Sequence, residues 1–84
     1  MRRPKTYTEG VGRFAALMRE KMQANSRKSG WRELDMATCY ERAMVEMAEL
    51  SEAMRSGKAR EIQGEAADVA NFLMMLFNAA AEGE

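Results

Sequence analysis

Apolar residues recur at helical spacing over three stretches of the chain, and polar residues separate these stretches. The first stretch follows Thr6-x-x-Glu9, a capping box in which each side chain satisfies a free backbone amide at the start of a helix. It ends at the polar residues 25–30. The pattern predicts an amphipathic helix, and its buried face holds Tyr7, Val11, Phe14, Ala15, Met18 and Met22.

The second and third stretches predict two further helices, joined by a short connection at 56–58. The second begins near Asp35, or at another capping box, Thr38-x-x-Glu41, and ends at Gly57, because glycine often terminates helices. Its apolar face holds Tyr40, Ala43, Met44, Met47, Leu50 and Met54. The third runs from about 59 to 81, and its inward positions are Ile62, Ala66, Val69, Leu73, Leu76, Phe77 and Ala80. A connection this short predicts antiparallel packing.

Strand-type alternation is absent, and the only proline, Pro4, precedes all three stretches. We therefore predict an all-α fold class, a small helical bundle of three helices in one domain that covers residues 1–84. Since 84 residues bury a limited core, oligomerisation is expected to add stability. Phe72, Met74 and Met75 fall away from the main stripe of the third helix, and an exposed apolar face of this kind is typical of a subunit interface.

The amino-acid composition excludes several classes of partner and active site. Thirteen basic residues balance thirteen acidic ones, so neither nucleic acid nor a membrane surface is an expected partner. Histidine is absent, which excludes imidazole metal sites and histidine-based acid–base catalysis. The lone Cys39 cannot form an internal disulfide, and the longest apolar run, 72–77, is too short to span a bilayer. These features are typical of a cytoplasmic protein.

Two acidic pairs are the strongest sign of function, Glu46-x-x-Glu49 on the second predicted helix and Glu65-x-x-Asp68 on the third. Residues three apart on a helix are neighbours, so their like charges repel. At about 100° per residue, each pair has nearly the same offset from the apolar stripe of its helix, and antiparallel packing would let both pairs face one cleft. Four converging carboxylates suit Mg²⁺, which binds carboxylates together with substrate phosphates. The plainer explanation is a solvated helix face, because single pairs of this kind are common.

The acidic pairs lie in a context that resembles a known family. Upstream of them the chain reads Lys21-Met22-x-x-Asn25-x-x-Lys28-Ser29-Gly30-Trp31. This stretch and the two pairs together resemble the MazG-like, all-α nucleoside triphosphate pyrophosphohydrolases, whose signature is Glu-x-x-Glu, a spacer and Glu-x-x-Asp. The resemblance covers about residues 14–78.

That resemblance implies a metal-dependent reaction. Glu46, Glu49, Glu65 and Asp68 would hold Mg²⁺, with Mn²⁺ as a substitute. A water activated by the metal would attack a phosphorus of a (deoxy)nucleoside triphosphate and release a monophosphate and pyrophosphate. A carboxylate that the metal does not fully use can accept the proton of this water, and we assign that catalytic role to Glu49. Many members carry a further helix, so we expect a partner subunit, in a homodimer or homotetramer, to complete a site that would otherwise be incomplete.

Two candidate substrate-binding residues lie in the predicted connection between the first and second helices. Lys28, with Arg27 or Arg32 as substitutes, could reach phosphate oxygens, although solvation explains a basic residue there equally well. Asn25 either caps the first helix or bonds a ligand.

Two further candidates are Trp31 and Asn71. A tryptophan is more often a core anchor than a platform for a nucleobase, but its position in a polar connection leaves both readings open. Asn71 follows Asp68 by one turn, and in the resembled family this position lines the nucleotide site. Its amide could equally be exposed to solvent.

We therefore predict an enzyme, a Mg²⁺-dependent pyrophosphohydrolase of nucleoside triphosphates. The main alternative is a non-catalytic dimerisation or regulatory module that binds a partner through its methionine-rich face. A third candidate is a di-metal hydrolase of another phosphoanhydride or of a phosphate ester.

Overall fold

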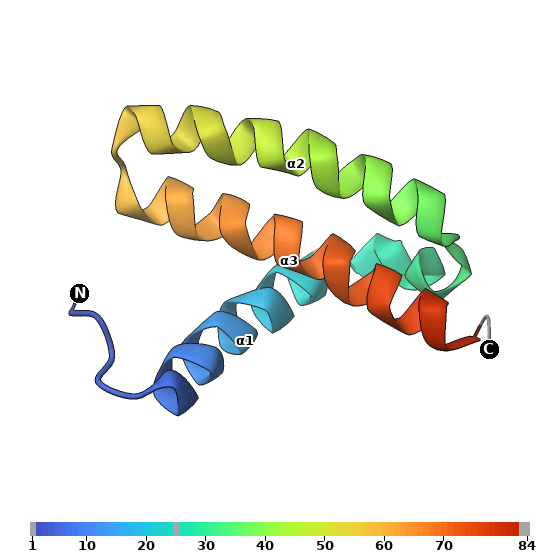
Figure 1. The fold of residues 1–84 in the computed structure, drawn as a ribbon, viewed down its shortest axis with the longest axis horizontal. Coiled ribbons are helices and arrows are strands. Elements are labelled where there is room, and N and C mark those ends of the chain that lie inside the picture. Colours follow the sequence, from blue (N-terminus) through green and yellow to red (C-terminus); the bar gives the residue numbers. More distant parts are fainter. Residues whose placement is uncertain (1, 25, 83–84) are drawn as a thin grey trace.

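The computed structural model describes residues 2–24 and 26–82, without the side chains of residues 26–29. Its elements are α1 (Tyr7–Ala24), a 3-10 helix η1 (Ser26–Glu33), α2 (Met36–Ser56) and α3 (Ala59–Glu82). Figure 1 shows α2 and α3 as an antiparallel hairpin, with α1 crossing α3 on the side away from α2. The predicted all-α fold class is confirmed, and the polar connection at 25–30 is largely the helix η1.

Local side-chain contacts set the helix ends. The Glu9 amide donates to Thr6 Oγ1 at 3.2 Å, which is one half of the predicted capping box. Asp35 is the N-cap of α2 and accepts from the Thr38 amide at 2.8 Å, so the helix begins at the first of the two predicted positions. Gly57 ends α2 in the left-handed conformation, at φ 72°, which glycine adopts without steric cost.

The hairpin packs closely because α2 contributes only small buried side chains, Cys39, Ala43 and Ala53. Cys39 and Ala43 form the core cluster with Phe72 and Met75 of α3. Partly buried side chains surround this cluster: Met22, Trp31, Leu34, Met74 and Leu76. The tryptophan therefore packs at the edge of the core, on η1.

Within the single chain, the predicted buried stripes are only partly correct: Ala43 and Val69 are buried as predicted, but several of the larger side chains are exposed. No residue of α1 is buried, and Tyr7 is 87% exposed. On α2 the predicted position Ala43 is buried, but so are Cys39 and Ala53, which lie outside the predicted stripe. These predicted positions are instead more than half exposed: Tyr40, Met44 and Met54. Cysteine and alanine are easily overlooked when a buried face is predicted from large apolar residues, yet their small side chains allow two helices to pack closely.

The expectation that Phe72, Met74 and Met75 form an exposed apolar face is wrong. Phe72 and Met75 are buried, with Met75 only 2% exposed, and Met74 is half-buried. Leu73 and Phe77 of the predicted inward stripe are exposed instead, Phe77 at 73%. The reason is that α3 is apolar on two sides and packs against both α2 and α1. It buries the predicted Val69 together with three residues that are each next to a predicted position, Ala67, Phe72 and Met75.

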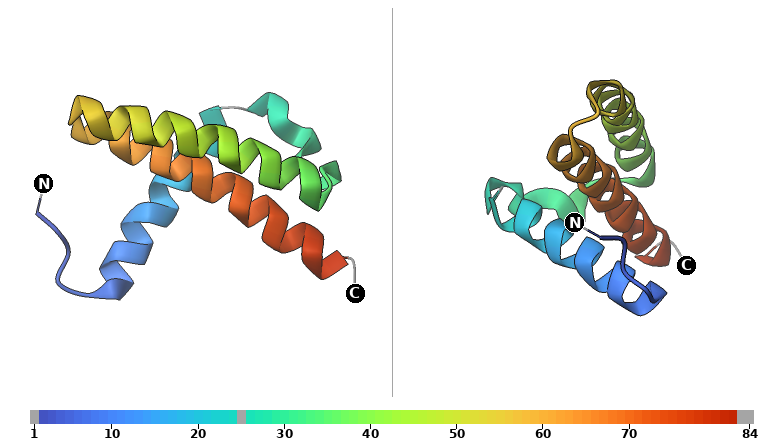
Figure 2. Two further views of the ribbon diagram at one scale, coloured as in Figure 1. Left: turned by 45° about the horizontal axis from the view of Figure 1, so that its top comes forward. Right: turned by 90° about the vertical axis from the view of Figure 1, so that its left-hand side faces the viewer.

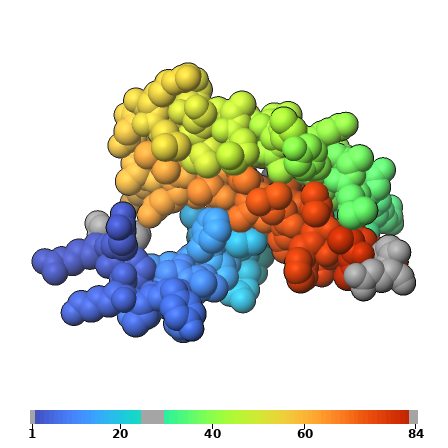
Figure 3. All heavy atoms as spheres, viewed as in Figure 1, coloured from blue at the N-terminus to red at the C-terminus, as the bar shows by residue number. Residues whose placement is uncertain are grey.

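α1 joins the hairpin mainly through its C-terminal half. Figure 2 shows it crossing α3 obliquely, and Figure 3 shows an opening between its N-terminal portion and α3. The Asn71 side chain donates to the Met18 carbonyl at 3.1 Å and thereby links α3 to α1. Among the described residues, no helix has the length and apolar character needed to cross a membrane.

Candidate metal centre

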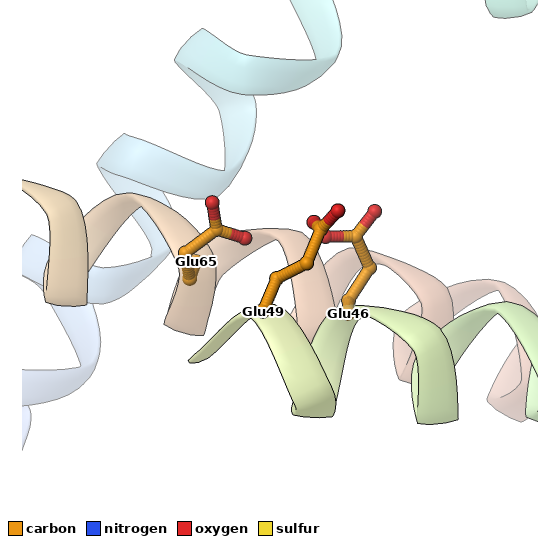
Figure 4. A group of neighbouring side chains, drawn as sticks. All are labelled: Glu46, Glu49 and Glu65. Carbon is orange, nitrogen blue, oxygen red and sulfur yellow. The ribbon is translucent and has the colours of Figure 1, made fainter. Parts of the chain in front are cut away.

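Three glutamates converge where α2 and α3 run side by side. Glu46 and Glu49 lie one turn apart on α2, and Glu65 lies on α3. One carboxylate oxygen of each lies within 4.8 Å of the others. Figure 4 shows the two side chains of α2 projecting together, with the Glu65 carboxylate beside them. The antiparallel hairpin thus brings together three of the four acids that the sequence pattern singled out.

Two of these carboxylates each have a buried oxygen without a hydrogen-bond partner, Glu46 Oε2 and Glu65 Oε2. Burial, followed by contact with Glu49 and repulsion from Asp68 and Glu65, raises the pKa of Glu46 to about 7. Burial also raises the pKa of Glu65, as do Glu49 and Asp68, while Glu46 and Lys21 oppose this change. The ionised forms of Glu46 and Glu65 are therefore energetically unfavourable in the metal-free protein.

A hard cation fits this donor set. Carboxylate oxygens are the preferred ligands of Mg²⁺, Mn²⁺ and Ca²⁺. An ion among the three glutamates would give the two buried, unpartnered oxygens a charge partner, and it would offset the mutual repulsion. The cluster could therefore bind a metal ion.

Asp68 lies outside the group of three. Its Oδ2 atom is 3.2 Å from Lys21 Nζ of α1. Asp68, Lys21 and Glu46 together line a polar cavity of about 220 Å³. The fourth predicted ligand therefore faces the same region but is paired with an ammonium group.

The proposed substrate-binding residues are not all brought to this region. Asn71 is 5% exposed and lines the 220 Å³ cavity, so the alternative of a solvent-exposed amide is wrong. Trp31 lines a different cavity with Met75 and the end of α3, a position that favours the core-anchor interpretation. Asn25 lies outside the described residues, and so does the side chain of Lys28.

Lys21 is the residue that sequence reasoning passed over. It appears in the motif that carries the family resemblance, but no role was assigned to it. A signal was present, because Lys21 stands between Met18 and Met22, both half-buried on the side of α1 that faces the hairpin. A lysine on the inner side of an amphipathic helix needs a charge partner, and the nearest acidic helix is α3.

Comparison with known proteins identifies the family. A model of the phosphoribosyl-ATP pyrophosphohydrolase family matches residues 11–81, most of the chain. Neither the search of curated proteins nor that of solved structures found a match. The matched family lies within the MazG-like, all-α superfamily, so the resemblance seen in the sequence is confirmed. The chain belongs to the phosphoribosyl-ATP pyrophosphohydrolase family, a family of hydrolases that act on pyrophosphate bonds.

Proposed function

We propose that this protein is a metal-dependent nucleotide pyrophosphohydrolase that cleaves (deoxy)nucleoside triphosphates to a monophosphate and pyrophosphate. The observation that carries the proposal is the group of three glutamates from two helices, with two buried oxygens that lack a partner. Membership of a pyrophosphohydrolase family supports the reaction class. The proposed cofactor is Mg²⁺, with Mn²⁺ as a substitute, because the donor set is made only of oxygen.

Each acid has a distinct part in this proposal. When bound, the metal would neutralise phosphate charge and make a water molecule more acidic. Glu46 and Glu65, whose unpartnered oxygens are buried, would hold the ion together with Glu49 and Asp68. Glu49 is the exposed member of the group of three, so it retains access to solvent and can accept the proton of the attacking water.

The family description favours one further substrate. Its name specifies phosphoribosyl-ATP, a nucleotide that also carries a triphosphate. The same metal group would serve both substrates, because the phosphates and not the base would contact the carboxylates. We therefore place phosphoribosyl-ATP in the substrate panel beside the ordinary triphosphates.

The test is product analysis with Mg²⁺, a panel of ribo- and deoxyribonucleoside triphosphates, and phosphoribosyl-ATP. We expect equal amounts of monophosphate and pyrophosphate from the preferred substrate. Reaction in heavy-oxygen water would show, by the product that carries the label, which phosphorus is attacked.

Two other results would lead to different conclusions. Diphosphate and orthophosphate would preserve the metal centre but overturn the pyrophosphohydrolase reaction. No turnover of any nucleotide, with no thermal shift on adding Mg²⁺, would favour the non-catalytic module.

The buried Cys39, which has no cysteine partner in the chain, agrees with our proposal of a cytoplasmic enzyme.

We also propose that the protein self-associates, as a homodimer or homotetramer, through an apolar side of the hairpin. The exposed residues Tyr40 and Met44 each follow a buried position on α2, and Leu73 follows buried Phe72 on α3. Because α2 and α3 are antiparallel, the residue that follows a buried position points to the same side of the hairpin on both helices. A second copy is the fitting occupant, because this core is small for an independent domain. At about 100° per residue, Glu49 lies about 180° from Tyr40 around α2, so the apolar side and this acid lie on opposite sides of the helix.

Leu73→Lys is expected to dissociate the oligomer and lower the melting temperature, because it places a charge within the apolar side. Size-exclusion chromatography with light scattering should then report the monomer mass, 9.5 kDa. Ala16→Lys is the matched control, since this exposed alanine lies on α1, outside the apolar side of the hairpin. A wild-type protein that is already monomeric would refute the proposal.

A further inference from the structure

Lys21 reaches the acidic region from a different helix than the acids themselves. Its ammonium nitrogen lies 3.2 Å from Asp68 Oδ2, and the two side chains are 34% and 26% exposed. It lines the 220 Å³ cavity together with Glu46 and Asp68. Lys21 is the only cationic residue that lines this cavity in the described part of the chain.

The ammonium group of Lys21 lies close to the backbone of α3 beside Glu65. A Cβ atom built on Gly64 would lie 3.7 Å from Lys21 Nζ, which is an ordinary van der Waals distance. Lys21 also follows Met18 by three residues, and Met18 is held to α3 by the hydrogen bond from Asn71. Its position relative to the acids is therefore set by both helices.

The ammonium group and a divalent cation would compete for Asp68, because both are attracted to the same carboxylate. A triphosphate brings several negative charges to a region that already contains four carboxylates, so it needs positive charge beyond that of the metal. An ammonium group offers three hydrogen-bond donors on a flexible stem. A short movement can therefore exchange a carboxylate oxygen for a phosphate oxygen.

We infer that Lys21 is a substrate-binding residue that neutralises Asp68 in the metal-free protein and turns to a phosphate oxygen when a divalent cation takes its place. This inference rests on the proposed function. It predicts opposite effects of one substitution, because removal of the ammonium group removes a competitor of the metal and a ligand of the phosphate.

The experiment compares the intact protein with Lys21→Met, which keeps the stem but removes the charge. Titration calorimetry with Mg²⁺ alone is expected to show binding about threefold or more tighter in the variant, and KM for the preferred nucleotide is expected to rise about tenfold or more. Lys21→Arg should keep KM near that of the wild type. Lys58→Met, at an exposed lysine between α2 and α3, should change neither quantity.

A structural role alone would lower both affinities together with the melting temperature, and that result would overturn the inference. Unchanged Mg²⁺ affinity in Lys21→Met would also overturn it. If Lys21→Met does not fold, Lys21→Gln takes its place. If the wild type hydrolyses no nucleotide, the proposed function fails, and binding of inorganic tripolyphosphate with Mg²⁺ still tests Lys21. Equal tripolyphosphate affinity in wild type and variant would then refute its role.

Discussion

Glu46→Gln is expected to lower nucleotide turnover by at least about 100-fold, because groups that only support a metal ligand already contribute 10–100-fold. The same substitution is expected to stabilise the metal-free protein. It keeps the shape of the side chain but removes a buried charge whose Oε2 atom has no partner. A gain of about 1 kcal/mol corresponds to an increase of about 4–8 °C in melting temperature for a domain of this size. Steady-state assays and calorimetry on one preparation measure both effects.

The opposite directions of these two effects distinguish a functional site from a structural one. Glu65→Gln should behave in the same way, since its Oε2 atom is also buried without a partner. Glu41→Gln, at an exposed glutamate of the same helix as Glu46, should change neither turnover nor stability. Full activity of Glu46→Gln would remove this residue from the metal centre, and a lower melting temperature would show that its charge is compensated.

The metal-free protein is expected to lose stability as the pH rises from about 4.5 to above 7. The pKa of Glu46 is raised from 4.5 to about 7 in the folded chain, so the folded state holds the proton more tightly than the unfolded state. Its contribution is fully present below the unfolded pKa and is lost as the pH passes the folded pKa. Allowing for the partial exposure of the side chain, we expect a loss of about 2 kcal/mol. Thermal unfolding in chelator across this range measures it.

Mg²⁺ is expected to reverse this loss, and its effect should grow with pH. At about 100 times its dissociation constant, a ligand of the folded state adds about 2.7 kcal/mol. Below the folded pKa of Glu46 the proton competes with the metal, so the thermal shift should be small near pH 5 and large near pH 8. Glu46→Gln should flatten both profiles. A Mg²⁺ shift that is equal at all pH values would contradict the competition.

The helix boundaries could be predicted because they depend on local chemistry. Thr6, Asp35 and Gly57 act on backbone groups within a few residues of themselves, so the printed sequence contains both partners of each contact. The pairing of the second and third helices also followed from the sequence, since a connection of a few residues leaves little choice but an antiparallel hairpin.

The candidate site could be predicted only in part. Spacing alone placed Glu46 and Glu49 side by side, and the hairpin placed Glu65 opposite them. The ion pair of Asp68 with Lys21 could not be derived in this way, because it depends on the angle at which α1 crosses α3. That angle is set by packing between residues far apart in the chain, Asn71 and Met18 among them.

By itself, the sequence determined the fold class, the helix ends, the family and the acidic pairs, because each is written in residues close together along the chain. Only the tertiary structure decided which apolar residues are buried. Cys39, which lay outside the predicted stripe, joins Ala43 in the core cluster, while the larger Tyr40 and Met44 are exposed. Burial depends on which face meets a neighbouring helix, and a helix with apolar residues on two sides does not specify that face in advance.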